Sequence, residues 1–175
     1  MRAPAFVLLL AGATAGVAEA QEHRVTMNLI SADGIGEPIG EVVIAETPAG
    51  VRFVPQLRGL PAGEHGFHLH ENGDCDPGPN DQGQVAAGMA AGDHWDPAGA
   101  GAHRGPDGDG HLGDLPVLVV QADGSAGSEA MAPRITDVTQ LKGKALMIHA
   151  GGDNFSDQPK PLGGGGARIV CGVIP

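Results

Sequence analysis

The sequence predicts an all-β domain, either an antiparallel sandwich or a Greek-key barrel. Seven short runs of residues are apolar or alternate between apolar and polar side chains, and turn-forming Gly, Pro or Asp residues separate them. Turns are expected to be frequent, because 30 Gly and 14 Pro occur among the 175 residues. Helical bundles and coiled coils are excluded, since no long stretch has helical periodicity. The length suits one domain.

The expected strands in chain order are His23–Ile30, Gly40–Glu46, Val51–Leu57, His65–His70, Leu115–Gln121, Ala145–His149 and Ala167–Ile174. Each is short, alternates or runs apolar, and ends near a turn signal. The only helical hint is the short segment Ile135–Leu141. Two stretches without periodicity, Glu71–Gly113 and Gly151–Gly166, are expected to be loops. Loops of this length inside a compact domain usually carry function.

The charge of the chain limits its partners. It has 10 Lys+Arg against 21 Asp+Glu, which gives a formal net charge of −11 and a pI near 4.9. Binding to nucleic acid or to an anionic membrane surface needs clustered basic residues, so neither partner is expected.

The first residues have the pattern of a secretory signal peptide. A basic start precedes an apolar run over 5–11, and Ala18-Glu19-Ala20 suits a signal peptidase. We therefore expect a signal peptide over 1–20 with cleavage near Ala20-Gln21, and an exported mature domain over 21–175. No other run is long and apolar enough for a membrane span. A buried N-terminal helix is the alternative interpretation.

Export bears on the two cysteines. Cys75 and Cys171 are the only pair, so an oxidising compartment would join them without any choice of partner. They lie 96 positions apart. On the chain-entropy model, closing a loop of that length is worth roughly 4–5 kcal/mol.

Two of the eight histidines stand on one predicted strand. The period of two puts His68 and His70 on the same face, where two imidazoles suit a single metal ion. His-x-His alone is a weak signal. His149 ends another apolar run, and by itself it would be interpreted as a core residue.

A second histidine cluster is more specific. His94, His103, His111 and Asp114 are separated by 9, 8 and 3 residues on a Gly/Pro-rich stretch. Three imidazoles and a carboxylate can surround a tetrahedral Zn²⁺ ion. A solvated loop with incidental histidines is the alternative.

At these motifs the chain resembles the copper–zinc superoxide dismutases, specifically the secreted bacterial branch. The matching segments are GEHGFHLHENGDC (63–75), HWDPAGAGAHRGPDGDGHLGDLP (94–116) and ALMIHAGGDNFSDQPKPLGGGGARIVCGVI (145–174). The resemblance covers essentially the whole mature chain. It implies an eight-stranded Greek-key β-barrel, an immunoglobulin-like sandwich with two long functional loops, and a periplasmic location.

The resemblance also implies the site residues. Copper would be bound by His68, His70, His94 and His149. Zinc would be bound by His94, His103, His111 and Asp114, so His94 would bridge the two metals. Asp153 resembles the carboxylate that joins a copper-ligand histidine to a zinc-ligand histidine, and Arg168 resembles the active-site arginine. His65 resembles a structural histidine bonded to backbone.

The implied activity is disproportionation of superoxide to O₂ and H₂O₂ by alternate reduction and oxidation of copper, with His94 carrying a proton. A copper/zinc-binding carrier without turnover is the alternative from another class. Arg168 and a bridging His94 argue against a carrier, since metal storage needs neither. A zinc hydrolase is disfavoured because Asp114 would close the zinc shell and leave no position for water.

Three further residues have assigned roles. Lys160 is the candidate for steering superoxide, since its loop borders the copper site in the family. Trp95, the only tryptophan, is either a packing residue or a homodimer contact, and we favour the contact. His23 would be the third residue of the mature chain, so a free amino terminus could form an accessory copper site with it. Asp93 and Phe155 depart from the usual family residues, glycine and tyrosine.

Overall fold

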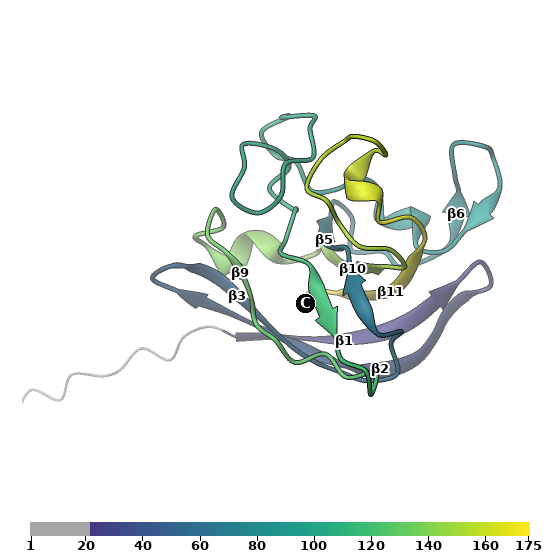
Figure 1. The fold of residues 1–175 in the computed structure, drawn as a ribbon, viewed down its shortest axis with the longest axis horizontal. Coiled ribbons are helices and arrows are strands. Elements are labelled where there is room, and N and C mark those ends of the chain that lie inside the picture. The colour runs from purple at the N-terminus through teal and green to yellow at the C-terminus, as the bar shows by residue number, and fades with distance from the viewer. Residues whose placement is uncertain (1–21) are drawn as a thin grey trace, which may run out of the picture.

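The computed structural model describes residues 22–175, which form a curled β-sheet with the long loops gathered on one side (Figure 1). The strands are β1 (Glu22–Ser31), β2 (Gly34–Thr47), β3 (Gly50–Leu57), β4 (Gly63–His65), β5 (Phe67–His70), β6 (Gly78–Pro79), β7 (Val85–Ala86), β8 (Leu118–Val120), β9 (Ala130–Ala132), β10 (Ala145–His149) and β11 (Arg168–Val173). Seven of them form one sheet in the order β5-β10-β11-β1-β2-β3-β9, and β4-β8 and β6-β7 form two smaller sheets. The strand pairs are antiparallel.

The predicted all-β Greek-key barrel is confirmed, and each expected run overlaps a strand. One expected strand, His65–His70, is interrupted at Gly66, so β4 pairs with β8 while β5 pairs with β10. A Cβ atom at Gly66 would lie 3.0 Å from the His68 ring. With β4 and β5 counted as one interrupted strand, the barrel has eight strands beside the small β6-β7 hairpin.

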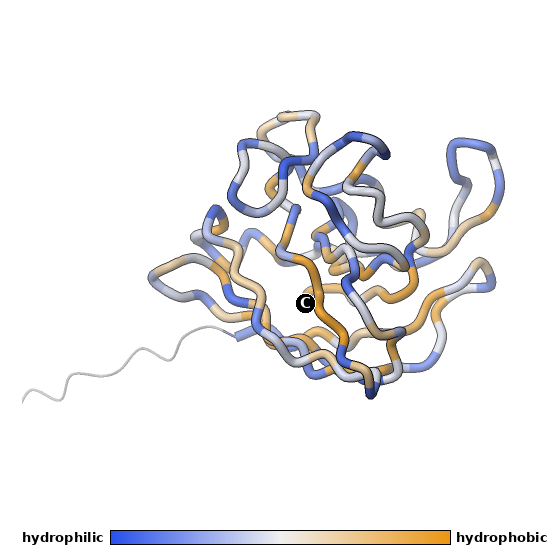
Figure 2. The backbone as a smooth tube through the Cα atoms, viewed as in Figure 1, coloured by the Kyte–Doolittle hydropathy of each residue, from blue (hydrophilic) through white to orange (hydrophobic). Residues whose placement is uncertain are grey.

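The apolar core fills the inside of the curl. Val25 and Met27 on β1 are fully buried, as is Phe53 on β3, and the rings of Phe53 and Phe67 meet edge to face at 6.0 Å. Figure 2 shows the hydrophobic residues along the strands and mostly hydrophilic residues in the loops. Apolar burial therefore holds the sheet, while the polar loops are left to build a site.

Several short elements of the structure were not predicted from the sequence. The loop 71–113 contains the β6-β7 hairpin and a 3₁₀ turn, η1 (Met89–Ala91). The segment with a helical pattern contains only a 3₁₀ turn, η2 (Val138–Leu141), which Asp137 caps by accepting from Thr139 N. A third 3₁₀ turn, η3 (Leu162–Gly164), ends the second long loop. These elements are too short to leave a periodic signal.

Cys75 and Cys171 form a disulfide with both residues buried. The bond joins the first long loop to β11, three residues after Arg168 on that strand. The expected signal peptide over 1–20 and its cleavage site at Ala20-Gln21 lie outside the described residues. Within 22–175, no helix is long and apolar enough to cross a membrane.

Candidate metal centre

Strand pairing brings distant histidines together over one end of the sheet. β10, which ends at His149, pairs with β5, which holds His68 and His70. Two single β-bridges join His70 to His94 and His68 to Asp114. The loop that follows β5 therefore returns alongside the strand and adds its own polar side chains.

Four buried histidines form a first group. Ligand-type atoms of His68, His70, His94 and His149 all lie within 4.8 Å of one another. Within residues 22–175, no hydrogen-bond partner is found for His68 Nδ1 or for the Nε2 atoms of the other three histidines. Buried polar atoms are normally paired, so four unpaired imidazole nitrogens that converge fit a metal ion better than a packed core.

Hydrogen bonds on the opposite ring nitrogens fix which nitrogens are free. His70 Nδ1 lies 2.9 Å from Gly92 O, and His149 Nδ1 lies 3.1 Å from Gly166 O. Because a carbonyl oxygen can only accept, the proton must be on Nδ1 in both rings. Each Nε2 therefore presents a lone pair to the centre of the group, as a metal ligand must.

A second group surrounds one carboxylate oxygen. Asp114 Oδ1 lies 2.9 Å from His94 Nδ1, 3.0 Å from His103 Nδ1 and 3.4 Å from His111 Nδ1. Only the His94 contact is aligned as a hydrogen bond, and Nδ1 of His103 and of His111 has no partner in the described part of the chain. Three imidazoles and one carboxylate, all buried, match a closed tetrahedral zinc shell.

His94 belongs to both groups. Its Nε2 atom faces the first group, while its Nδ1 atom faces Asp114. The ring is 2% exposed and lies between the two groups.

Asp153 links the two groups through ring nitrogens that face away from the centre of each group. Its Oδ2 atom accepts from His68 Nε2 at 2.7 Å, and its Oδ1 atom accepts from His103 Nε2 at 2.8 Å. Burial alone would raise the pKa of Asp153, but the hydrogen bonds from His103 and His68 hold that pKa far below its usual range. Asp153 is therefore an anion that orients one ring in each group.

Burial keeps several of these imidazoles neutral. It lowers the pKa of His94 to about 3, and it lowers the pKa values of His70 and His149 well below the ordinary 6.5. These shifts include a smaller lowering from neighbouring histidines in all three rings. Neutral imidazole is the form that binds metals.

Arg168 lies beside the opening from solvent to the first group, which we call the mouth. Its Nη1 donates to Gly88 O at 2.6 Å and its Nη2 donates to Gly92 O at 2.7 Å. A cavity of about 240 Å³ opens here, lined by Met89, His94, His149, Pro161, Leu162, Gly166 and Arg168. Among these lining residues, Arg168 is the one cation that is fixed in charge, so the mouth is suited to a small anion.

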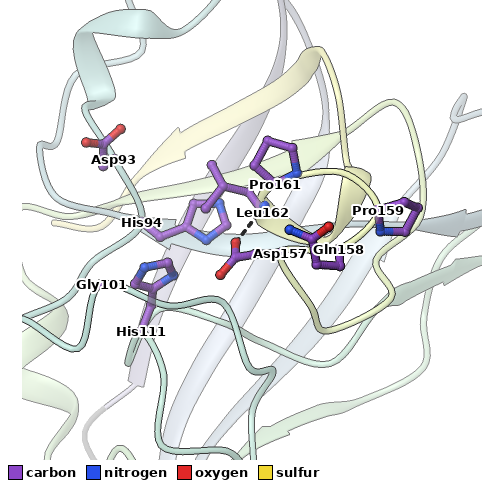
Figure 3. A pocket seen from close by; sticks show the side chains of 9 residues that line it. All are labelled: Asp93, His94, Gly101, His111, Asp157, Gln158, Pro159, Pro161 and Leu162. Atoms are coloured by element: carbon purple, nitrogen blue, oxygen red, sulfur yellow. Dashed lines mark hydrogen bonds between the residues drawn. The ribbon is translucent and has the colours of Figure 1, made fainter.

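A second cavity, of about 560 Å³, lies beside the second group (Figure 3). It is lined by Asp93, His94, Gly101, His111, Asp157, Gln158, Pro159, Pro161 and Leu162. His94, Pro161 and Leu162 line both cavities. Leu162 and Pro161 therefore form a wall between the two openings.

Other residues expected to function lie outside these mouths. Lys160 is exposed, but its side chain packs over Gly164 and lines a separate cavity beside Asp153. Trp95 is only 8% exposed and belongs to the apolar core, with Lys144 Nζ 5.7 Å from the ring centre. Within this chain Trp95 therefore packs against the core, and its role at a homodimer contact stays a prediction.

Two further histidines are held by the backbone. His65 Nδ1 lies 2.7 Å from His149 O, and its Nε2 lies 2.8 Å from Pro61 O, so His65 braces a strand rather than facing the groups. His23 lies in β1 opposite Ile44. A copper site that used the amides of Glu22 and His23 would require the start of β1 to separate from β2.

Over residues 39–174 the chain matches the protein family described as copper/zinc superoxide dismutase (SODC). The chain belongs to this family. It is 57% identical over 170 residues to superoxide dismutase (Cu-Zn) 2 of Salmonella typhimurium, covering 97% of this chain and 96% of the relative. The solved Cu/Zn superoxide dismutase from Brucella abortus superposes with a TM-score of 0.86 at 46% identity, over 89% of this chain and 100% of the other. The solution structure of the monomeric copper, zinc superoxide dismutase from Salmonella enterica superposes with a TM-score of 0.79 at 58% identity, over 89% of this chain and 100% of the other.

Membership of the superoxide dismutase family fixes the reaction and the cofactors. The enzyme disproportionates superoxide to O₂ and H₂O₂ (EC 1.15.1.1), and copper and zinc are its metals. The two histidine groups fit both ions, since each supplies buried nitrogens without other partners among the described residues.

Proposed function

We propose that the first group binds copper and the second binds zinc, with His94 as the ligand common to both. The copper ligands are His68, His70, His94 and His149. The zinc ligands are His94, His103, His111 and Asp114. The observation that carries this assignment is the convergence of buried, unpartnered ring nitrogens, within residues 22–175, on two centres that share one ring.

The donor sets distinguish the two metals. Four imidazoles suit copper, which also stands at the top of the divalent affinity series. Three imidazoles and a carboxylate suit tetrahedral zinc, and Asp114 completes that shell. Asp153 would hold the rings of His68 and His103 in the orientation that both metals need.

Copper supplies the one-electron chemistry, and this chain supplies the binding of superoxide and the proton. Each terminal nitrogen of Arg168 uses one N–H on a carbonyl of Gly88 or Gly92 and keeps a second N–H. These remaining donors can bind and orient the superoxide anion in the mouth.

We assign the proton transfer to His94 Nε2. This atom lies at the floor of the mouth, and Asp114 fixes the ring from the Nδ1 side at 2.9 Å. One imidazole nitrogen cannot bind a metal ion and a proton at once, so Nε2 would carry the proton only while it does not bind copper. From there the proton can pass to the departing peroxide. The second proton comes from solvent through the open mouth.

Two matched substitutions test the metal assignment. His111→Ala removes a ligand of the second group only, and His70→Ala removes a ligand of the first group only. We expect dialysed His111→Ala to lose zinc and keep copper, and His70→Ala to lose copper and keep zinc. Metal content by mass spectrometry would contradict the assignment if the two losses were exchanged or if neither metal depended on these residues.

We also propose that the mature domain is periplasmic after removal of residues 1–20. The basic start, the apolar run and the Ala18-Glu19-Ala20 sequence support this proposal. Amino-terminal sequencing of the protein recovered from a periplasmic extract should begin at Gln21. Recovery of the unprocessed chain in the cytoplasm would rule the proposal out.

A homodimer with Trp95 at its contact is a separate proposal from the sequence. Lys144 Nζ also donates to Glu71 O at 3.0 Å, so a partner could reach Trp95 only after this lysine moves. The solved Salmonella enterica relative is described as monomeric. Sedimentation velocity of the wild-type protein decides the question, because a monomer at micromolar concentration would rule the contact out.

Lys160 is proposed to steer superoxide from a distance. Charges act over about 10 Å at 0.1 M salt, so a lysine need not line the mouth to raise the association rate. We expect Lys160→Met to lower kcat/KM and to flatten its dependence on salt, and Lys142→Met to change neither. Equal kinetics for the two variants would exclude the role of Lys160.

A further inference from the structure

We propose that Asp157 is a positioning residue that ties the zinc-ligand loop to the wall of the copper mouth. This inference rests on the proposed metal assignment. Asp157 Oδ2 accepts from the backbone N–H of His103 at 3.0 Å, and Oδ1 accepts from the backbone N–H of Leu162 at 3.1 Å. Figure 3 shows the carboxylate of Asp157 between the rings of His94 and His111 and the backbone of Leu162.

With the first bond, two carboxylates accept hydrogen bonds from one proposed zinc ligand, His103. Asp153 accepts from the ring of His103, and Asp157 accepts from the backbone of the same residue. Both carboxylates come from the loop 151–166, whereas His103 lies in the loop that follows β5. The ring and the main chain of His103 are thus held by one neighbouring loop.

The second bond holds an unusual backbone conformation. Leu162 has φ +53°, in the left-handed region that side chains with a Cβ atom rarely adopt. Its N–H is held by Asp157, and its side chain is 37% exposed where it lines both cavities. A strained residue at a mouth persists only when its surroundings fix it, and Asp157 supplies one of those constraints.

The two bonds couple the zinc ligand to the mouth. The hydrogen bonds of Asp157 go to backbone N–H groups and not to the imidazole nitrogens that face the metals. Asp157 therefore acts through His103 and Leu162 rather than on the reaction itself. If the carboxylate is lost, the main chain of His103 is less restrained and Leu162 can leave its left-handed conformation. Zinc retention and the shape of the copper mouth should therefore change together.

Holoenzyme variants test this coupling. Asp157→Ala removes both acceptors, and Asp157→Asn keeps one oxygen acceptor for one of the two N–H groups. Asp96→Ala is the matched control, because Asp96 Oδ2 accepts from Gly101 N at 2.8 Å within one loop and does not join two loops. The measurements are zinc release to a chromogenic chelator and azide affinity, followed by the absorption of the copper centre.

We expect Asp157→Ala to release zinc about 10–100-fold faster, on the basis that removal of outer partners of metal ligands lowers metal affinity by that factor. Azide affinity should fall about threefold or more, because water that enters past Leu162 screens the Arg168 charge. Asp157→Asn should lie between wild type and Asp157→Ala in both measurements. Asp96→Ala should leave azide affinity unchanged.

The inference is overturned if Asp157→Ala has the same zinc release rate and the same azide affinity as the wild type. It is also overturned if Asp157→Ala changes only the zinc release rate, and by the same factor as Asp96→Ala. If Asp157→Ala does not fold, Asp157→Asn and the control carry the same comparison. Failure of the metal assignment would appear differently, as wild-type protein without zinc or without an azide-sensitive copper band, and would overturn this inference with it.

Discussion

Arg168 Nη2 lies 2.7 Å from the carbonyl oxygen of Gly92. The same oxygen lies 2.9 Å from His70 Nδ1, so one peptide group anchors both the cation at the mouth and a proposed copper ligand. Shared anchoring fixes the guanidinium relative to the copper site, which is the preorganisation that an anion-binding group needs.

Replacing Arg168 should impair the reaction with superoxide without loss of copper. A hydrogen bond to a charged group contributes about 1.5–3 kcal/mol, so Arg168→Ala should lower kcat/KM by about 10–160-fold. Pulse radiolysis at several salt concentrations measures this. Arg134→Ala is the control, because Arg134 also bonds two loop carbonyls, those of Gly110 and His111, but lies outside the mouth. Equal rates for the two variants would contradict the role of Arg168.

Removal of the Asp153 carboxylate should free zinc before copper. Asp153→Ala leaves the outer nitrogens of His68 and His103 without their acceptor, and such losses cost about 10–100-fold in metal affinity. Each metal keeps three ligands that do not depend on Asp153, but copper stands at the top of the divalent affinity series, so a similar loss of affinity should release zinc first. Competition with a zinc chelator measures the affinity. A zinc affinity within threefold of wild type would show that the two rings are oriented by packing alone.

Loss of the disulfide should destabilise the fold. Replacing Cys75 and Cys171 with serine opens a loop with a sequence separation of 96, which should cost roughly 4–5 kcal/mol of unfolding free energy. Urea unfolding of the metal-free protein measures the difference. The wild-type protein with reduced cysteines is the control and should match the double variant. A change below about 1 kcal/mol would mean that packing alone holds the loop 71–113 on β11.

Acid should destabilise the metal-free protein well above the pKa of its carboxylates. The pKa of folded His94 is about 3, against 6.5 for an ordinary histidine, and His70 and His149 are shifted in the same direction. Between these pH values the unfolded chain binds protons that the native protein excludes. Each such histidine therefore lowers the unfolding free energy by about 1.4 kcal/mol per pH unit as the pH falls below 6.5.

One zinc-site histidine acts in the opposite direction on the alkaline side. Burial alone would lower the pKa of His103, but the carboxylates of Asp114 and Asp153 raise it to about 9. Its stabilising contribution is complete below pH 6.5 and is lost as the pH rises through 9. The metal-free protein should therefore be most stable near pH 6.5. A stability that is level from pH 6.5 to 4 in urea titrations would contradict the burial of neutral imidazoles.

The strands and the zinc group were predicted from local signals, whereas the copper group, which adds His149 to His68 and His70, was implied by the family resemblance. Alternation marked β1 and β3, and the spacing of His94, His103 and Asp114 marked the zinc group. The sequence could not predict the break at Gly66, since that break depends on the pairing of β4 and β5 with different strands. Nor could it place Trp95, because Lys144 covers that ring from a distant part of the chain.

The role of Asp157 was missed for a similar reason. Its two acceptors meet N–H groups that lie 54 and 5 positions away along the chain, and no motif records such contacts. Lys160 was placed in the correct loop, but the direction of its side chain depends on the fold of 151–166.

The central claim is that His94 joins a copper site and a zinc site that together dismutate superoxide. The most direct measurement is the dismutation rate of the domain 21–175 reconstituted with one copper and one zinc ion. We predict a rate constant near the diffusional range of about 10⁸–10⁹ M⁻¹s⁻¹, abolished when the metals are removed. Tight binding of both metals without turnover would contradict the claim and would leave a metal carrier on this barrel.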